Sequence, residues 1–489
     1  MVESRPASLV ETLISVVVFV GDRVYKLKKP LRLDYLDFST VEARRRMCER
    51  EVELNRRLAP DVYLGVADVT GPDGTVCDHL VVMRRMPDER RLSTCVAGGT
   101  DDLDACLRDL ARLLAVFHAR AERGPRIDAL AGAGAVEARW ADNFATMGPY
   151  AGTVFDAGDL DRAEHLATRF IDGRGALFDE RVAGGHACDG HGDLQCADVF
   201  CLDDGPRVLD CIEFDDTLRY GDVAEDVAFL VMDLERLGGA EVAQRFRRDY
   251  EEFAGEVFPA ALLHLYVAYR AQVRAKVAAL RWGQDADEAT RQEARLLLGL
   301  CLAHLEQARV RFVLVGGLPG TGKTTLARGL AEVLGCALVR TDEVRDAIAP
   351  AVDEQPGDGY RQGAFTPETT DAVYRAALAQ AHTALARGES CILDASWSDA
   401  SQREDARDLA RRVGAALVEL RCEVDPATAA ARIRDRLAAG LDASRATPTV
   451  AERMAADADA WPEAVAVDTT ATPADTVAVA VAHLPGRGS

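Results

Sequence analysis

The feature that most constrains this chain is a glycine-rich loop placed between an apolar run and a helical pattern. Residues 317–324 read Gly-Leu-Pro-Gly-Thr-Gly-Lys-Thr and match every fixed position of the pattern GxxxxGK[ST]. The apolar run Phe312–Gly316 before them predicts a buried strand, and the segment after them predicts a helix. Glycines let backbone N–H groups turn inward and surround phosphate oxygens, and the helix N-terminus adds a positive dipole. The sequence therefore predicts a phosphate-binding loop.

This loop indicates ATP and Mg²⁺ as cofactors. We expect Lys323 to reach the β- and γ-phosphates and Thr324 to ligate Mg²⁺. Apolar runs recur at 336–340, 390–393, 415–422 and 464–467, separated by helical patterns, which predicts an α/β P-loop NTPase fold with a parallel sheet. The predicted nucleotide contacts are Gly317, Leu318, Pro319, Gly320, Thr321, Gly322, Lys323, Thr324 and Thr325.

Charged residues at the carboxyl ends of these strands are the candidate catalytic groups, because ligands of open α/β sheets bind there. Asp342 is placed to orient or deprotonate an acceptor hydroxyl, and Asp394 to organise Mg²⁺; either aspartate can instead cap the following helix. Arg403 follows Asp394 by nine residues and is a candidate phosphate clamp. Arg432 and Arg436 are candidate lid arginines that neutralise a transferring phosphoryl group, with a solvated arginine-rich face as the alternative.

The length of the chain requires more than this one domain. A single hydrophobic core stops growing at about 250–300 residues, and the chain has 489. Its character changes near Arg311, so we predict domains at 1–305 and 306–489. Within the first, residues 1–88 form a small α+β lobe and residues 89–305 a helical lobe.

The small lobe is predicted from two hairpins around one helix. Apolar runs at 13–20 and 23–28 flank Gly21-Asp22, and runs at 62–70 and 76–86 flank a Gly-Pro-Asp-Gly turn. A helical stripe covers Val41–Leu58. The region from Asp101 to Ala308 is helical except for an island at 186–222 with short strands.

A second set of candidate catalytic residues spans this first domain. His191-Gly192-Asp193 lies in a polar turn, and the segment 207–214 is predicted as a strand ending in Asp210 and Glu213. Strand alternation places Lys26 and Lys28 on one face, and Glu51 in the following helix is placed to pair with Lys26. A base beside metal-binding carboxylates and a phosphate-binding lysine is what phosphoryl transfer needs.

Both halves resemble known kinase families. Residues 311–485, with the phosphate loop and Thr341-Asp342-x-x-Arg345, resemble gluconate kinase, polynucleotide kinase and zeta-toxin-type P-loop domains. The first domain resembles the aminoglycoside phosphotransferase branch of the bilobal protein-kinase fold, and the whole chain resembles bacterial fusions of the two. The resemblance implies Asp193 as the catalytic base, Lys26 and Glu51 at the nucleotide phosphates, and Asp210 or Glu213 as a metal ligand.

Three positions depart from the phosphotransferase pattern. Asp198 stands where the family places an asparagine metal ligand, so it offers an oxygen but adds a negative charge. The glycine-rich loop of protein kinases is replaced by a tight turn at Gly21-Asp22, and Asp-Phe-Gly by Glu213-Phe214-Asp215. These departures favour a second hypothesis, in which the first domain is a non-catalytic nucleotide or metabolite sensor that regulates the P-loop kinase.

Composition excludes several other classes. The net charge of -22 argues against broad nucleic-acid binding, so a nucleic-acid end kinase is the weaker alternative. No apolar stretch reaches membrane-span length and no basic leader precedes 13–20, which predicts a cytoplasmic protein without membrane partners. The twelve cysteines show no metal-ligand spacing and are predicted to be free thiols, those at 196, 201 and 211 being buried and inert. The predicted partners are small hydroxyl acceptors, and the acidity favours a cationic one at the first domain.

Overall fold

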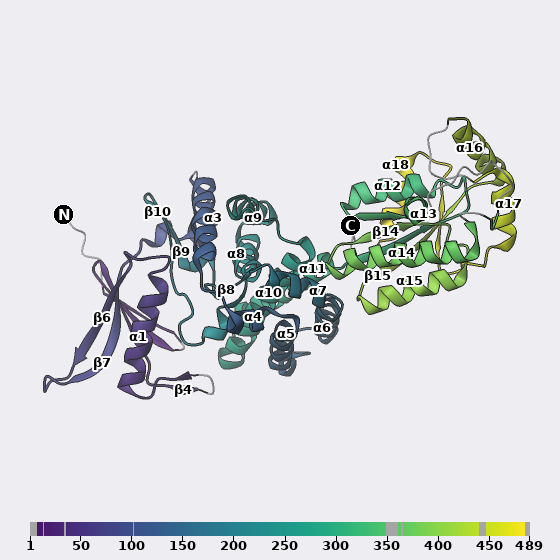
Figure 1. Cartoon of the computed structure of the whole chain (residues 1–489). Coiled ribbons are helices and arrows are strands. Elements are labelled where there is room, and N and C mark those ends of the chain that lie inside the picture. The colour runs from purple at the N-terminus through teal and green to yellow at the C-terminus, as the bar shows by residue number, and fades with distance from the viewer. Residues whose placement is uncertain are drawn as a thin grey trace. The chain divides into compact units, whose positions relative to one another are not determined.

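The described part of the chain packs into two compact units (Figure 1). The computed structural model describes residues 7–12, 14–33, 36–100, 102–348, 360–362, 365–439 and 446–484. Part of the middle of the chain packs with the second unit, where Arg169 donates to the backbone carbonyls of Gly414 and Ala415 at 3.1 and 2.6 Å. The first unit holds the chain up to Ala157, Asp179–Phe258 and Leu263–Cys301, and the second holds Gly158–Phe178, Pro259–Leu262 and the chain from Leu302 onward.

A five-stranded antiparallel sheet forms the start of the first unit, with the order β1-β2-β3-β7-β6. Both predicted hairpins are confirmed, since β2 pairs with β3 and β6 with β7. The first turn requires Gly21, whose φ of 59° lies in the left-handed region. The strands are β1 (Ser8–Glu11), β2 (Ser15–Val20), β3 (Arg23–Lys28), β6 (Tyr63–Thr70) and β7 (Val76–Arg84), and β4 (Arg32–Leu33) pairs separately with β5 (Leu36–Asp37).

The predicted helix of the small lobe is α1 (Val41–Asn55), which packs against β6 and β7. It begins at Thr40, whose hydroxyl accepts a hydrogen bond from the N–H of Ala43 at 3.1 Å. Its apolar face, including Cys48 and Val52, joins the core of the sheet. The same face carries the fully buried carboxylate of Glu51, so the packing that forms the lobe also fixes a charge inside it.

The rest of the first unit is mainly helical, as predicted, and none of the described helices is long and apolar enough to cross a membrane. The helices from here to the second sheet are α2 (Leu92–Gly98), α3 (Leu103–Arg120), α4 (Pro125–Ala131), α5 (Ala133–Met147), α6 (Ala157–Asp172), α7 (Gly175–Ala183), α8 (Val223–Gly238), α9 (Ala240–Ala254), α10 (Ala260–Asp285) and α11 (Glu288–Gln307), with short 3-10 turns η1 (Asp88–Arg90), η2 (Gly148–Tyr150), η3 (Cys196–Asp198) and η4 (Asp216–Leu218).

The island between α7 and α8 contains two short strand pairs. β8 (Ala187–Asp189) pairs with β11 (Tyr220–Asp222), and β9 (Val199–Leu202) pairs with β10 (Gly205–Val208). The prediction of a strand over 207–214 is therefore wrong beyond Val208. The extended conformation ends because Asp210 has a φ of 65°, in the left-handed region that strands do not use.

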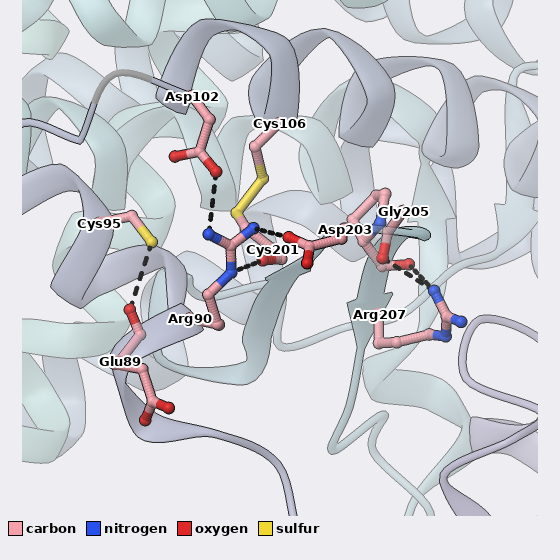
Figure 2. The surroundings of a disulfide bond; sticks show 10 residues. Glu89, Arg90, Cys95, Asp102, Cys106, Cys201, Asp203, Gly205 and Arg207 are labelled. Atoms are coloured by element: carbon pink, nitrogen blue, oxygen red, sulfur yellow. Dashed lines mark hydrogen bonds and ion pairs between the residues drawn. A yellow bond between two sulfur atoms is a disulfide. The ribbon is translucent and has the colours of Figure 1, made fainter.

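A disulfide joins α3 to β9 through Cys106 and Cys201, which corrects the prediction that every cysteine is a free thiol (Figure 2). The two residues are 95 positions apart, so only the packing of α3 beside the β9–β10 hairpin brings them together. The ten other cysteines form no disulfide. The prediction of inert thiols holds at Cys196 and Cys211, because burial raises the pKa of the Cys196 thiol well above its usual value and that of Cys211 to about 12.

Removal of this disulfide by Cys106→Ser is expected to lower the free energy of unfolding of the first unit by roughly 2–4 kcal/mol, because a long closed loop restricts the unfolded chain. The check is denaturant unfolding without reductant, with Cys77→Ser, at an exposed free thiol, as the control. Equal stability of Cys106→Ser and wild type, or twelve rather than ten titratable thiols in unfolded, unreduced protein, would contradict the prediction.

The second unit is a five-stranded parallel sheet with the order β13-β14-β12-β15-β16, which confirms the predicted α/β fold. Its core lies between the sheet and helices α12 and α18 and includes Val313, Leu326 and Val477. The strands are β12 (Arg311–Gly316), β13 (Ala337–Arg340), β14 (Cys391–Asp394), β15 (Ala416–Glu423) and β16 (Val465–Asp468), and the helices are α12 (Lys323–Leu334), α13 (Thr341–Ile348), α14 (Pro367–Ala386), α15 (Ala400–Arg412), α16 (Pro426–Ala439), α17 (Pro448–Asp457) and α18 (Pro473–Ala482).

Candidate active sites

The glycine-rich loop connects β12 to the first turn of α12, which begins at Lys323. Gly317, Gly320 and Gly322 have φ values of 141°, 85° and 85°. A Cβ on Gly317 would lie 2.5 Å from the hydroxyl oxygen of Thr321, and one on Gly320 would lie 2.5 Å from the carbonyl oxygen of Ala429. Both the backbone conformation and the space therefore require glycine, as a phosphate-binding loop does.

A carboxylate and a hydroxyl meet beside this loop. The Thr324 hydroxyl donates to Oδ2 of Asp394 at 2.7 Å, and Arg340 Nε lies 3.4 Å from the same oxygen. Burial raises the pKa of Asp394, although the charge of Lys323 opposes the rise. The other carboxylate oxygen, Oδ1, is buried and has no hydrogen-bond partner. An orphaned carboxylate oxygen beside a threonine hydroxyl fits Mg²⁺, which prefers hard oxygen ligands.

The remaining acidic candidate, Asp342, lies in the first turn of α13, where β13 ends. The preceding residue, Thr341, connects this turn to Asp394, because its hydroxyl donates to the backbone carbonyl of Asp394 at 3.2 Å. The charge of Asp342 also contributes to the raised pKa of Asp394. Asp342 and Asp394 therefore face a common region at the carboxyl ends of neighbouring strands β13 and β14.

The three arginine candidates occupy different places. Arg403 is buried, and its guanidinium donates to the carbonyls of Trp397 and Ala460 at 2.6 and 2.7 Å. These bonds hold the loops that follow β14 and α17, so the geometry favours a structural role over the predicted phosphate clamp. Arg432 lies against the phosphate loop, with one nitrogen 3.6 Å from a Cβ built on Gly322. Arg436, one turn further along α16, donates to the carbonyl of Ala446 at 3.3 Å.

A cleft of about 660 Å³ lies beside the loop in the second unit. It is formed where β12, β14, β15 and β16 end, and Leu318 of the loop lines it. Its volume is within the range of roughly 300–1,000 Å³ that small-molecule sites occupy. The charged and aromatic residues that line the cleft are Trp397, Arg421, Glu423, Asp425, Asp459, Trp461 and Asp468.

The first unit brings its own lysine and acids together. Lys26 Nζ lies 2.8 Å from Oε1 of Glu51 and 2.6 Å from Oδ1 of Asp210. Burial lowers the pKa of Lys26, but the charges of Asp210 and Glu51 outweigh this and hold it well above its usual value. The predicted Lys26–Glu51 contact is therefore present, and Asp210 is the acid that joins it.

A second lysine, Lys28, shares the same glutamate. Strand alternation predicted Lys28 on the same face as Lys26, but the sequence assigned it no role. Lys28 Nζ lies 2.6 Å from Oε2 of Glu51 and also contacts Oε1 of Glu213. The side chains of Lys28 and Glu213 are 0% and 6% exposed, whereas those of Lys26 and Asp210 are 14% and 51% exposed. The sequence left Asp210 and Glu213 open as the metal ligand, and this difference in exposure favours Asp210.

The predicted base, Asp193, lies in a loop that a buried aspartate organises. Asp226 of α8 accepts hydrogen bonds from the N–H groups of His191 and Gly192 at 2.7 and 2.9 Å, and His118 Nε2 lies 3.1 Å from it. Burial alone would raise the pKa of Asp226, but the hydrogen bond with His118 holds it well below the usual value. The sequence does not predict this role, because a single aspartate inside an apolar helix pattern carries no signal of its partner.

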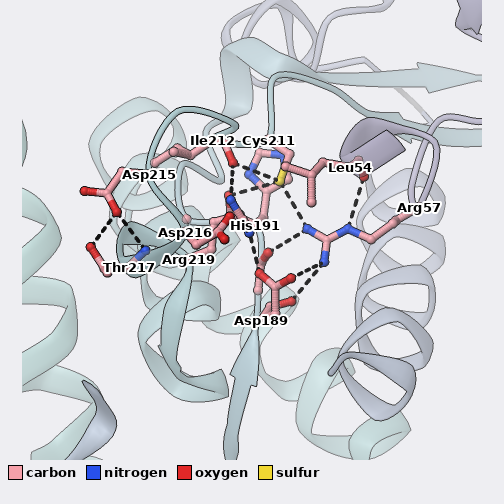
Figure 3. Close-up of polar contacts among 12 residues, drawn as sticks. Leu54, Arg57, Asp189, His191, Cys211, Ile212, Asp215, Asp216, Thr217 and Arg219 are labelled. Carbon is pink, nitrogen blue, oxygen red and sulfur yellow. Dashed lines mark hydrogen bonds and ion pairs between the residues drawn. The ribbon is translucent and has the colours of Figure 1, made fainter. Parts of the chain in front are cut away.

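The loop is also tied to the end of α1 (Figure 3). Arg57 donates to the backbone carbonyls of Asp189 and Gly190 at 3.1 and 2.9 Å and to the sulfur of Cys211 at 3.2 Å. His191 itself is buried, with Nε2 3.1 Å from the carbonyl of Leu209, and burial lowers its pKa to about 4. A neutral histidine therefore forms part of the support for the loop.

Three carboxylates influence one another at this site. Burial raises the pKa of Asp193 to about 6, and the charge of Arg274 opposes the rise. Burial and then the charges of Asp210 and Asp193 raise the pKa of Asp198 well above its usual value. A cation between Asp198 and Asp210 would relieve this repulsion, so the residues fit Mg²⁺. No preformed group of three metal-ligating side chains exists among the described residues, and nucleotide phosphates commonly complete Mg²⁺ sites.

Comparisons with known proteins match both units. Residues 33–262 match the model of the phosphotransferase enzyme family, and residues 312–460 match that of an AAA domain. An uncharacterised protein of Mycobacterium tuberculosis is 41% identical over 461 residues, which cover 94% of this chain and 91% of that protein.

Two solved structures illustrate the matches to each half. A choline/ethanolamine kinase family protein from Mesorhizobium loti is 15% identical over 62% of this chain and 88% of its own, with a TM-score of 0.39. A gluconokinase from Sinorhizobium meliloti is 17% identical over 35% of this chain and 90% of its own, with a TM-score of 0.26.

Proposed function

We propose that this phosphotransferase carries two separate Mg-ATP sites and phosphorylates small hydroxyl acceptors at each. The chain belongs to the family of its Mycobacterium tuberculosis relative. It joins an aminoglycoside phosphotransferase-like domain to a P-loop kinase-like domain. The observation that carries the proposal is that each unit has its own lysine near a carboxylate that suits a metal ion. In the second unit the pair is Lys323 and Asp394, and in the first unit it is Lys26 and Asp210.

In the second unit, the loop N–H groups and Lys323 hold the nucleotide phosphates. Thr324 and the free oxygen of Asp394 hold Mg²⁺, which supplies charge neutralisation at the β- and γ-phosphates when bound. Asp342 orients the acceptor hydroxyl and accepts its proton as the oxygen attacks. Arg432, beside the loop, stabilises the charge of the transferring phosphoryl group.

In the first unit, Lys26 moves its contact from Asp210 to the nucleotide phosphates while Glu51 keeps it in place. Asp198 and Asp210 are then the metal carboxylates, and Mg²⁺ supplies the same neutralisation there. Asp193 is the base for the acceptor hydroxyl, and its pKa of about 6 lets it hold either a proton or a charge near neutral pH.

The cleft beside the phosphate loop is the proposed region through which an acceptor reaches Asp342, which is itself not among the lining residues. Four carboxylates line it, at 423, 425, 459 and 468, against the guanidinium of Arg421, which pairs with Glu423 at 2.6 Å. Such a lining suits a polyol or an amine-bearing alcohol better than an acid. We therefore propose that the small hydroxyl acceptor is neutral or positively charged.

The test of the two-site proposal is a titration of the full-length chain with the non-hydrolysable analogue AMP-PNP and Mg²⁺. We expect two binding events in wild type and the loss of one in Lys26→Met, because removing a charged donor to phosphate weakens binding by roughly 10–100-fold. Lys29→Met is the matched control, since Lys29 lies in the same hairpin but pairs with Glu11. Retention of both events in Lys26→Met, in folded protein, would refute nucleotide binding through Lys26.

A further inference from the structure

Lys28 is a buried charge that the proposed chemistry does not use. Its side chain is 0% exposed, and its partners are Glu51 and Glu213, whose side chains are 0% and 6% exposed. Burial lowers its pKa, but the charges of Glu51 and Glu213 outweigh this and raise the pKa above its usual value, so the lysine is charged. Burying an ionic group costs free energy unless its partners are well placed, which makes a structural or functional reason for this residue necessary.

The partner Glu213 lies three residues after Asp210, in a segment that other groups also hold. The N–H of Asp210 donates to the Tyr63 hydroxyl at 3.1 Å, and the N–H of Cys211 donates to Oδ1 of Asn55 at 2.9 Å. Asp210 itself has a φ of 65°, a conformation that costs a non-glycine residue free energy and persists only when its surroundings enforce it. Lys28 anchors the far end of this segment through Glu213.

The other partner, Glu51, has one carboxylate oxygen on each lysine. When Lys26 turns from Asp210 toward a nucleotide phosphate, Glu51 must stay in place to keep its contact with Lys26. Lys28 remains on the second oxygen, so Glu51 stays ionised and in its rotamer inside the lobe. One buried lysine thus acts on both groups that flank the site: the glutamate behind Lys26 and the segment that carries Asp210.

We propose that Lys28 is a positioning residue that holds Asp210 in place for Mg²⁺ and Glu51 in place for Lys26, and that Glu213 is its anchor rather than a metal ligand. The inference rests on the proposed nucleotide site of the first unit. Loss of groups that orient metal ligands commonly costs 10–100-fold in metal affinity. We therefore expect Lys28→Met to lower the Mg²⁺ affinity of the nucleotide-bound site by at least about tenfold, so that Mg²⁺ strengthens nucleotide binding less than in the parent.

The experiment uses the full-length chain with Lys323→Met, which leaves the first-unit site to be observed. AMP-PNP affinity is measured by titration across a series of Mg²⁺ concentrations. The expected order is full Mg²⁺ dependence in the parent and in Lys29→Met, partial dependence in Lys28→Arg, and little in Lys28→Met and Asp210→Asn. Glu213→Gln, which keeps a hydrogen-bond acceptor for Lys28, is expected to retain Mg²⁺ dependence within about threefold of the parent, against the 10–100-fold expected for a lost metal ligand.

The outcomes separate this inference from the function on which it rests. If the parent shows no Mg²⁺-dependent binding, the proposed site fails. If the parent binds and Lys28→Met keeps its Mg²⁺ dependence, or Glu213→Gln loses it as fully as Asp210→Asn, the positioning role is overturned. Should Lys28→Met not fold, as thermal melting would reveal, the comparison of Lys28→Arg, Glu213→Gln and Asp210→Asn still decides between anchor and ligand.

Discussion

Lys323→Met is expected to reduce phosphoryl transfer by the second unit by roughly 10²–10³-fold or more, because the variant loses the charged donor that stabilises the transition state at the phosphates. This lysine begins the first turn of α12 directly after the glycine loop, and its charge acts on the carboxylate of Asp394. The measurement is transfer of radioactive phosphate from ATP to a panel of polyols, sugars and amino alcohols, with Asp193→Asn present in every variant so that transfer by the first unit does not mask the loss.

The matched control is Arg328→Gln, which removes one positive charge from an exposed position of the same helix. It is expected to transfer phosphate at the wild-type rate. Transfer by Lys323→Met at the rate of this control would show that the glycine loop is not the site of transfer. A 5′-hydroxyl oligonucleotide included in the panel distinguishes the small-molecule kinase from a nucleic-acid end kinase.

Asp193→Asn is expected to reduce transfer by the first unit by roughly 10²–10⁴-fold, because an amide cannot accept the proton of the acceptor hydroxyl. Nucleotide binding through Lys26 should persist, since Asp193 is not among the contacts of that lysine. The measurement is the same transfer assay in the Lys323→Met background. Asp193→Glu is the control that keeps a carboxylate in the loop.

The pH dependence of this site follows from the pKa of about 6 that burial gives Asp193. The base works only when ionised, so the rate should fall as pH drops through about 6. The pKa of Asp193 is higher in the folded than in the unfolded chain, so its contribution to stability is full below the unfolded pKa and is lost as pH rises through the folded one. Asp193→Asn removes that loss and should be at least as stable as wild type at pH 7. Wild-type transfer by Asp193→Asn with Lys323 intact, together with no transfer by Lys323→Met, would instead support a nucleotide sensor in the first unit.

Much of the fold could be predicted because its signals are local. The glycine loop after Phe312–Gly316, the turn at Gly21 and the helical stripe from Val41 each depend on neighbours within a few residues. The face shared by Lys26 and Lys28 also follows from strand alternation, and the structure confirms it through their common partner Glu51.

The rest of the site depends on contacts that no local pattern encodes. The exposures that favour Asp210 over Glu213 arise from packing against Lys28, 185 residues away from Glu213. The left-handed conformation of Asp210 ended a strand that its apolar neighbours predicted. Arg403 lies at a plausible spacing after Asp394, but the carbonyls that occupy it belong to residues as distant as Ala460.

The disulfide between α3 and β9 also has a consequence for the order of events on the ribosome. Cys106 is synthesised 95 residues before Cys201, a delay of roughly 5–20 s at ordinary rates of translation. The nearest cysteine available during that interval is Cys95, which the native chain keeps as a buried free thiol with its sulfur 3.8 Å from the carbonyl of Glu89 (Figure 2). Because α2 packs against η3, β9 and α8, which are synthesised with or after Cys201, Cys95 is buried only at the end of that interval and competes for Cys106 until then.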